Sequence, residues 1–235
     1  MDDIASAFAQ ALSLVISGDP AIVEIVALSL RVTLSAVVIA CAIGLPLGAA
    51  LAVWPFPGRT IAVIAINALM GLPPVVVGLF VYLMLSNAGP LGVLQLLYTP
   101  AAMIAAQALL VTPIVAGLTR QVIEDLNAEY DEQLRSMGIT RLGAVATLLW
   151  DGRYSLMTVA LAGFGRAVAE VGAVLIVGGN IDHVTRVMTT SIALEVSKGN
   201  LALALGLGII LVIISVLVNG MVFVLRGAHR PGVTQ

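Results

Sequence analysis

Long apolar runs alternate with short breaks along most of this chain. Five runs approach or exceed the roughly 20 residues that a helix needs to cross a bilayer, and they cover residues 24–53, 60–86, 101–119, 154–179 and 201–225. The breaks between them are rich in Pro, Gly, Asn and Asp, which favour turns. This pattern predicts an all-α membrane protein with about five transmembrane helices.

The first residues follow a different pattern. Residues 4–17 alternate apolar and polar positions as an amphipathic helix does, over a length too short to span a bilayer. Gly18 and Pro20 favour an end to that helix, and the acidic start is unlike a cleavable signal peptide. We therefore expect an N-terminal interfacial segment over 1–23, a transmembrane domain over 24–225 and a tail over 226–235.

The composition agrees with a chain that lies mostly in membrane lipid. Of the 235 residues, 60% are hydrophobic and 10% are charged, whereas a soluble domain carries about 25% charged residues. The net charge of -2 argues against nucleic acid as a partner, because a nucleic-acid-binding face is basic. Cys41 is the single cysteine, so no disulfide can form within the chain.

Basic residues are unevenly distributed between the two sides that five spans would define. Short cytoplasmic loops carry an excess of Lys and Arg. With the N-terminus outside, Arg186 and Lys198 fall outside, and the arginines that fall in the cytoplasm are Arg59, Arg120, Arg135, Arg141, Arg153, Arg226 and Arg230. This bias predicts an exterior N-terminus, a cytoplasmic C-terminus and a cytoplasmic loop over 120–153.

The loop over 120–153 is polar, with four Arg and six Asp or Glu. Apolar residues recur in it every three or four positions, which predicts two amphipathic helices, with the sharp turn between them at Gly138. The third span is the shortest of the five and could extend into 120–127. The apolar faces would be formed by Leu126, Tyr130, Leu134 and Met137 and then by Leu142, Val145, Leu148 and Leu149, with Glu129, Asp131 and Glu132 as an acidic side.

The sequence lacks the signatures of catalysis and of metal binding. It contains no GxxxxGK[ST] phosphate-binding loop, so we expect no ATP site in this chain. His183 and His229 have no metal-ligand spacing around them, and no Ser, His and acid motif is recognisable. We therefore expect a chain that is not an enzyme, with no catalytic residue, no metal site and no cofactor of its own.

Glycine and proline recur inside the predicted spans. Small residues let membrane helices approach closely, and prolines kink helices. Pro73 and Pro74 in the second span are interpreted either as packing features or as a bend beside a transport pathway. Near the expected outer ends of two spans, Gly178 and Gly179 are candidates for a gate, as is the turn at 89–90.

Three ionisable residues lie within predicted spans, namely Arg31, Arg166 and Glu170. A charge at the bilayer centre costs about 2.5–3.5 kcal/mol on insertion scales. Arg166 and Glu170 are four residues apart on one helical face and can neutralise each other. Alternatively, Arg166 faces the pathway and offers a positive site to a passing anion. Arg31 lies near the outer end of the first span, where its side chain can reach the headgroups.

Two short motifs in the polar loop give the chain a family resemblance. They are EQLRSMG at 132–138 and, nine residues later, LLWD at 148–151. Together they resemble the "EAA" loop of permease subunits of bacterial ABC importers, whose pattern is EAA, three residues, Gly, nine residues, then I-x-L-P. Glu132, Gly138 and Leu148 match that pattern in register.

Three further segments extend the resemblance over residues 24 to 225. GLPPVVVGL at 71–79 and FGRAVAEVGAVLIVGGNI at 164–181 resemble spans of molybdate, tungstate and sulfate importers. TRVMTTSIALEVSKGNLALALGLGIIL at 185–211 resembles the tungstate permeases within that group.

The resemblance implies the type I ABC importer permease fold and a place in the cytoplasmic (inner) membrane of a bacterium or archaeon. Two copies of the permease, a homodimer, would line one pathway. A cytoplasmic ABC ATPase dimer would bind ATP and Mg, and a periplasmic or lipid-anchored binding protein would deliver an oxyanion, with tungstate as the preferred cargo. ATP binding would turn the pathway outward, and hydrolysis would return it inward.

The resemblance also implies residue roles in the loop, which would couple the pathway to the ATPase. Glu132, with Gln133 beside it, would face a groove on the ATPase, and Gly138 would make the turn. Leu134, Met137 and Leu148 would anchor the coupling helices. Residues 133–134 replace the two alanines of the family pattern, and residues 150–151 replace its Leu-Pro, so we expect the exit from the loop to differ.

Other interpretations remain at this point. Molybdate or sulfate is the alternative cargo. An ion-coupled secondary transporter would need its own coupling-ion site with intramembrane acids, for which Glu170 is the candidate, and it would move cargo without an ATPase. A membrane anchor for a cytoplasmic complex is a third function, but it would not require Gly and Pro at so many depths.

Overall fold

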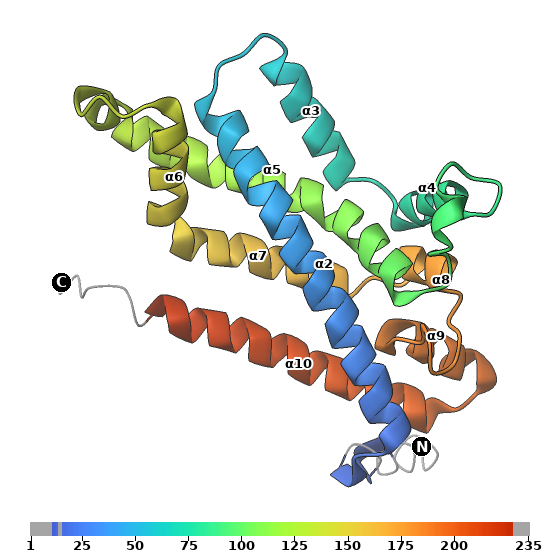
Figure 1. The fold of residues 1–235 in the computed structure, drawn as a ribbon. Helices are drawn as coiled ribbons and strands as arrows, with labels where there is room; N and C mark the ends of the chain where they lie inside the picture. Colours follow the sequence, from blue (N-terminus) through green and yellow to red (C-terminus); the bar gives the residue numbers. More distant parts are fainter. Residues whose placement is uncertain (1–10, 14–15, 228–235) are drawn as a thin grey trace. The chain divides into compact units, whose positions relative to one another are not determined.

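The computed structural model describes residues 11–13 and 16–227, and every secondary-structure element in this part is helical, in agreement with the expected all-α class (Figure 1). Most of the expected interfacial helix over 4–17 and of the tail falls outside the described residues. The elements are α2 (Pro20–Val53), α3 (Arg59–Met70), α4 (Pro74–Leu85), the 3₁₀ turn η1 (Gly92–Leu94), α5 (Pro100–Ser136), α6 (Arg141–Asp151), α7 (Arg153–Val168), α8 (Gly172–Gly178), α9 (Met188–Lys198) and α10 (Leu201–Gly227).

Several of these helices are long and apolar enough to cross a membrane. By length and composition, Pro20–Val53, Pro100–Ser136 and Leu201–Val224 each qualify alone. The pairs α3 with α4 and α7 with α8 qualify when each pair is taken as one span with a short break. The described part of the chain therefore holds three to five candidate spans, and the upper value agrees with the sequence expectation.

α2 begins four residues before the expected span, because its start is capped. Oδ1 of Asp19 accepts a hydrogen bond from the N–H of Ala21 at 2.8 Å, which satisfies one of the free donors of a helix start. Pro20 occupies the first helical position, where its missing N–H is harmless.

In each of the two broken pairs, the break between the helices lies where backbone groups lack their helical hydrogen bonds. α3 ends at Met70 and α4 begins at Pro74, because a proline has no N–H and disfavours helical geometry in the residue before it. The break over 169–171 was not expected from the sequence. There Oε1 of Glu170 accepts the N–H of Ala173 at 3.0 Å, a side-chain contact that replaces a helical bond.

α5 does not end at the expected membrane boundary near residue 119 but continues to Ser136. Between Gly117 and Ser136 the chain contains no Gly or Pro, so nothing in this stretch interrupts the helix. Two ion pairs at i,i+4 spacing support the polar half, Arg120 with Glu124 and Asp131 with Arg135.

The chain packs into two compact units, each assembled from separate stretches of sequence. Within the described residues, unit 1 takes those up to Ser35, Pro74–Gln107 and Val168–Met221. Unit 2 takes Ala36–Pro73, Ala108–Ala167 and the end of α10.

In unit 2, α2 and α5 approach closely through small residues. A Cβ atom added at Gly48 would lie 2.3 Å from the backbone oxygen of Ala116, and one at Gly44 would lie 2.8 Å from Val115 Cγ1. The expectation that glycines permit close packing of membrane helices is therefore confirmed for these two positions.

In unit 1, α4 and α8 pack against each other. A Cβ atom at Gly78 would lie 2.7 Å from the Cα of Ala173, so the contact has no room for a side chain. A second core of this unit joins Ile22 of α2, Met188 of α9 and Leu207 of α10. α9 is an element that the sequence analysis did not place.

Candidate functional site

The polar loop over 120–153 forms a helical hairpin, which we call the α5–α6 hairpin. It consists of α5 from Arg120 onward, the turn at 137–140 and α6. Its core is one cluster of buried residues that also includes Ala49 of α2, namely Ala49, Ile123, Leu134, Ala144, Val145 and Leu148. Apolar contacts therefore hold the hairpin together and fasten it to α2 within unit 2.

The turn of the hairpin has the geometry that its glycine favours. Gly138 has φ 68°, the left-handed conformation that most residues avoid. Its N–H donates to the backbone oxygen of Arg135 at 3.0 Å, and the N–H of Ile139 donates to that of Leu134 at 3.1 Å. These two bonds form a Schellman motif, and the predicted turn at Gly138 is confirmed.

α6 is capped at its start and joined to α7 through one residue. The Thr140 hydroxyl accepts the N–H of Gly143 at 3.2 Å, which caps the helix. At the other end, the Arg153 guanidinium lies 4.8 Å from the ring centroid of Trp150 and 4.6 Å from that of Tyr154. Trp150, one of the two residues that replace the Leu-Pro of the family pattern, therefore takes part in a cation–π contact with Arg153.

The structure divides the residues expected to act in coupling into two groups. Leu134 and Leu148 lie in the hairpin core. Glu132, Gln133, Met137 and Gly138 are exposed. Met137 does not share the apolar face of α5, because the helix ends before it and Ile139 packs on the cluster instead.

Two apolar side chains of α6 also face outward. Leu142 is 68% exposed and Trp150 is 69% exposed. The sequence analysis grouped Leu142 with Val145 and Leu148, but Leu142 lies outside the core that these two residues join. The hairpin therefore presents apolar side chains beside charged ones at its surface.

An ion network that the sequence analysis missed lies next to the hairpin. Nε of Arg59 donates to the backbone oxygen of Leu51 at 2.7 Å, and its Nη2 pairs with Glu124 of α5. Arg120 pairs with the other oxygen of Glu124. The four-residue spacing of Arg120 and Glu124 is a signal for their pairing, but no local pattern points to Arg59.

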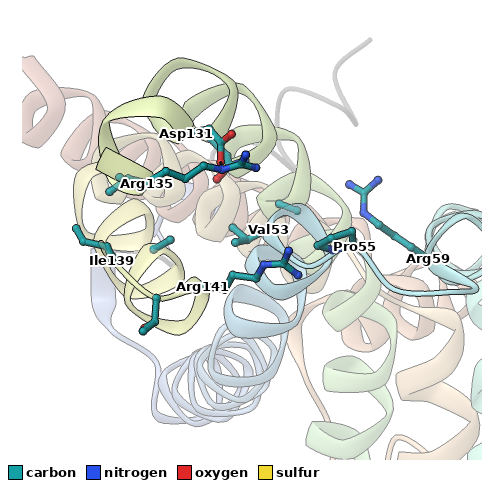
Figure 2. Close-up of a pocket in the computed structure, with 12 residues that line it drawn as sticks. Val53, Pro55, Arg59, Asp131, Arg135, Ile139 and Arg141 are labelled. Carbon is teal, nitrogen blue, oxygen red and sulfur yellow. Dashed lines mark hydrogen bonds and ion pairs between the residues drawn. The ribbon is translucent and has the colours of Figure 1, made fainter. Parts of the chain in front are cut away.

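A pocket with a volume of about 630 Å³ opens beside the hairpin within unit 2 (Figure 2). In Figure 2, Arg135 reaches toward Asp131, with which it pairs at 3.0 Å, and Arg141 extends toward Pro55. The lining combines polar residues from three helices with an apolar wall, and its members are Ala52, Val53, Pro55, Arg59, Asn127, Asp131, Leu134, Arg135, Ile139, Thr140, Arg141 and Ala144.

A second polar region lies in unit 1 around Glu170, which is 3% exposed. Besides capping α8, Glu170 accepts the hydroxyl of Thr189 at its backbone oxygen, at 2.8 Å. Ser29 and Gln107 line a small cavity with it, of about 10 Å³, which is near the size of one water site. Arg166 is half-buried in α7, and its predicted pairing with Glu170 stays a prediction.

The gate candidates pack against a loop of unit 1. Gly179 has φ 70°, and a Cβ atom there would lie 2.9 Å from Cδ1 of Tyr98; one at Gly178 would lie 3.0 Å from Sδ of Met103. The N–H of Tyr98 donates to the backbone oxygen of Val177 at 2.9 Å. Pro73 and Pro74 flank the start of α4. The gate and pathway roles of these residues stay predictions.

His183, interpreted as an isolated loop residue, has an acidic neighbour. Its Nδ1 lies 2.8 Å from Oε2 of Glu24, and this hydrogen bond and the charge of Glu24 raise the pKa of His183. Asp182 adds to the effect. Among the residues that the structure describes, no group of three or more His, Cys, Asp or Glu side chains could hold a metal ion.

Comparison with known proteins adds a family match and full-length relatives. The model of the family described as "Binding-protein-dependent transport system inner membrane component" matches residues 44–233. The tungstate uptake system permease protein TupB of Peptoclostridium acidaminophilum is 40% identical over 226 residues, which cover 96% of this chain and 99% of the relative.

Two more relatives cover most of the chain. A probable anion ABC transporter permease protein of Haloferax volcanii is 38% identical over 85% of this chain and 88% of its own length. The TupB of Campylobacter jejuni is 34% identical over 93% of this chain and 92% of its own length. Relatives at lower identity are named as sulfate and molybdate/tungstate permeases.

Proposed function

Because the chain belongs to the family of binding-protein-dependent transport system inner membrane components, we propose that it is the permease subunit of an ATP-driven importer for tungstate. The assignment of tungstate as the cargo rests on the 40% identity over 96% of the chain with a tungstate uptake permease. A permease of an ABC uptake system works with an ATPase and a substrate-binding protein. In this proposal the partner ATPase binds ATP and Mg, and the chain itself catalyses no reaction.

The ATPase contact is assigned to the exposed end of the α5–α6 hairpin. Glu132, Gln133 and Met137 are exposed there, and Leu142 and Trp150 add apolar area. Apolar side chains among charged ones suit a protein partner better than water. Beneath this surface Leu134 and Leu148 join the two helices, so a force on the exposed end would move the hairpin as one body.

In the proposed cycle, ATP binding closes the ATPase dimer and draws together the hairpins of two permease copies. The pathway then opens outward to a binding protein, and hydrolysis returns it inward. The pathway is assigned to the broken helices, because irregular backbone at membrane depth persists only where protein or a water-filled cavity surrounds it. Pro73, Pro74, Gly178 and Gly179 flank their ends, and Arg166 and Glu170 are candidates for contact with the anion or with each other.

The proposed location is the inner membrane, with an exterior N-terminus and a cytoplasmic C-terminus. The distribution of charge supports this orientation. The arginines expected inside that the structure describes, from Arg59 to Arg226, all belong to unit 2, together with the hairpin. Arg186 and Lys198, expected outside, belong to unit 1. Basic residues favour the cytoplasmic side of a membrane protein.

Reconstitution in vesicles with the ATPase and the binding protein tests the proposal. We expect ATP-dependent tungstate uptake, and we expect Glu132→Arg combined with Gly138→Pro to reduce uptake and ATPase docking more than tenfold. Asp125→Arg reverses the same charge about two turns earlier on α5 and serves as the control. If the double variant docks and transports normally, the coupling assignment is wrong. Tungstate accumulation by this chain alone would instead indicate an ion-coupled transporter.

The cargo is tested on the binding protein, where selectivity is expected to lie. Calorimetric titrations with tungstate, molybdate and sulfate compare the affinities directly. We expect tungstate to bind most tightly. A sulfate affinity that equals or exceeds that for tungstate would overturn the assignment of the cargo while leaving the importer function in place.

A further inference from the structure

We propose that the pocket beside the α5–α6 hairpin binds a tetrahedral oxyanion of the phosphate class, carried either by a soluble ion or by the headgroup of an anionic phospholipid. No residue at the breaks over 71–73 and 169–171, where the helices assigned to transport are interrupted, lines this pocket. The inference goes beyond the proposed function, and transport of tungstate can be correct without it.

The charges around the pocket do not cancel. Arg59, Arg135 and Arg141 line it together with Asp131. Glu124 pairs with Arg59 and with Arg120 at the edge of the pocket. Four guanidinium groups against two carboxylates leave an excess of two positive charges in this cluster, which an anion would neutralise.

Guanidinium donors remain available to a ligand. Asp131 accepts from Nε of Arg135, so the two outer nitrogens of Arg135 are not used by that bond, and its side chain is largely exposed. Arg141 has no ion pair with any residue in the described part of the chain. The planar fork of an arginine matches two oxygens of a phosphate group.

The backbone adds a second favourable contribution. Thr140 and Arg141, the cap and the first residue of α6, both line the pocket. The start of this 11-residue helix carries free N–H groups and the positive end of the helix dipole, which favour an anion. This contribution supplements the three arginines.

Part of the pocket lining is apolar and bears on the source of the anion. Val53 is the last residue of the spanning helix α2, Pro55 follows that helix, and Ile139 comes from the turn of the hairpin. A wall of this kind at the end of a membrane span suits a lipid headgroup with its glycerol, and it also excludes water from a bound phosphate ion. An anion bound there would link Arg141 of α6, Arg135 of α5 and Arg59 of α3, and would stiffen the hairpin.

Titration of the full-length chain with inorganic phosphate, in nanodiscs of phosphatidylcholine, tests the site. Phosphorus NMR line broadening reports binding, and we expect it to saturate and to weaken with salt. Arg141→Ala should weaken binding about tenfold, as expected for loss of a charged hydrogen-bond donor. Arg153→Ala, which removes the same charge from unit 2 outside the pocket, should leave the affinity unchanged.

A variant that binds more tightly cannot be explained by misfolding, so it distinguishes loss of the site from loss of the fold. Asp131→Asn removes a lining carboxylate and frees Arg135, so it should tighten phosphate binding several-fold. Arg141→Lys should retain part of the affinity because it keeps the charge but loses the planar fork. If none of the lining variants changes phosphate binding relative to Arg153→Ala, the site is overturned for soluble anions.

A second arm separates the two sources of the anion. The same chain is placed in nanodiscs with phosphatidylglycerol, and retained lipid is counted by native mass spectrometry. Retention of phosphatidylglycerol that depends on Arg141 and competes with phosphate identifies the headgroup as the ligand. Phosphate binding that phosphatidylglycerol does not displace identifies a soluble anion. Lack of any dependence on Arg141 in both arms refutes the proposal.

Discussion

The α5–α6 hairpin of unit 2 and the α8 region of unit 1 are organised by different kinds of contact. The hairpin is stabilised mainly by residues that are close in sequence. Gly138 forms the turn, Thr140 caps α6, and apolar residues of the two helices form the core. Around α8, the buried Glu170 carboxylate accepts the N–H of Ala173, and a hydroxyl from a distant segment bonds the backbone just before the helix. Glu170 is bonded by Thr189, 19 residues away.

This difference predicts different sensitivities. The hairpin should respond to loss of apolar volume and of turn geometry, because its polar groups lie at the surface. The α8 region should respond to loss of single polar atoms, because an unpaired polar group costs more when it is buried than when water can reach it.

The largest expected effect is on the hairpin core. Leu148→Ala removes a fully buried side chain, and such changes cost about 2–5 kcal/mol. Hydrogen exchange of the α6 amides should accelerate accordingly. Leu142→Ala is the matched control, because the same side chain on the same helix is exposed, and it should leave exchange unchanged while weakening the ATPase contact. Equal effects of the two variants would contradict the assigned core.

The second effect concerns the cap of α8. Glu170→Ala leaves the N–H of Ala173 without its acceptor, whereas Glu170→Gln keeps an oxygen there. Both variants remove the charge, and Glu170→Gln keeps the acceptor and most of the side-chain volume, so Glu170→Ala should be the less stable variant by about 1–3 kcal/mol. Thermal unfolding in detergent measures it. Identical stabilities would show that the cap contributes nothing.

A smaller effect is expected at the turn. Gly138→Ala places a side chain at φ 68° with open space around it, so the cost is conformational, about 1–2 kcal/mol. Gly165→Ala lies in helix α7 with no atom within 4 Å of the added Cβ and should be neutral or slightly stabilising. Thermal unfolding of the two variants in parallel checks the contrast.

The smallest expected effect is on pH dependence, and it should appear around His183 in unit 1 and not in the hairpin of unit 2. The hydrogen bond to Glu24 and the charge of Glu24 raise the pKa of His183 in the folded protein above its ordinary value of 6.5. The pair therefore stabilises the fold fully below pH 6.5, and this contribution is lost as pH rises through the raised pKa. The hairpin has no histidine. Hydrogen exchange near residue 183 should increase from pH 6 to 8, after correction for the intrinsic rate, and His183→Gln should abolish the change.

Local signals were sufficient for much of the fold. The five apolar runs, the helical hairpin and the turn at Gly138 depend on hydrophobic periodicity, charge and one glycine, which are properties of neighbouring residues. The start of α2 at Asp19 and Pro20 was also accessible, because a capping residue before a proline is a helix-start signal.

The rest depended on contacts that no local pattern encodes. The break over 169–171 depends on the Glu170 carboxylate, which accepts the N–H of Ala173, and the periodicity of the apolar residues does not reveal that bond. Arg59 and Glu124 are 65 residues apart, so their pairing required the fold. Ile139 takes the place predicted for Met137, because the Schellman turn reverses the chain before the next apolar residue.

α5 has a mechanical consequence that extends past the hairpin. The part of this helix in unit 2 runs from Ala108 to Ser136 and is about 44 Å long at 1.5 Å per residue. Pro113 is the one proline inside it, where a backbone hydrogen bond is missing. A twist applied at Ser136 therefore meets Pro113 inside the unit 2 part of the helix, where the missing hydrogen bond lets the helix yield. The stiffness of the helix at Pro113 sets how much of the twist is passed on within unit 2.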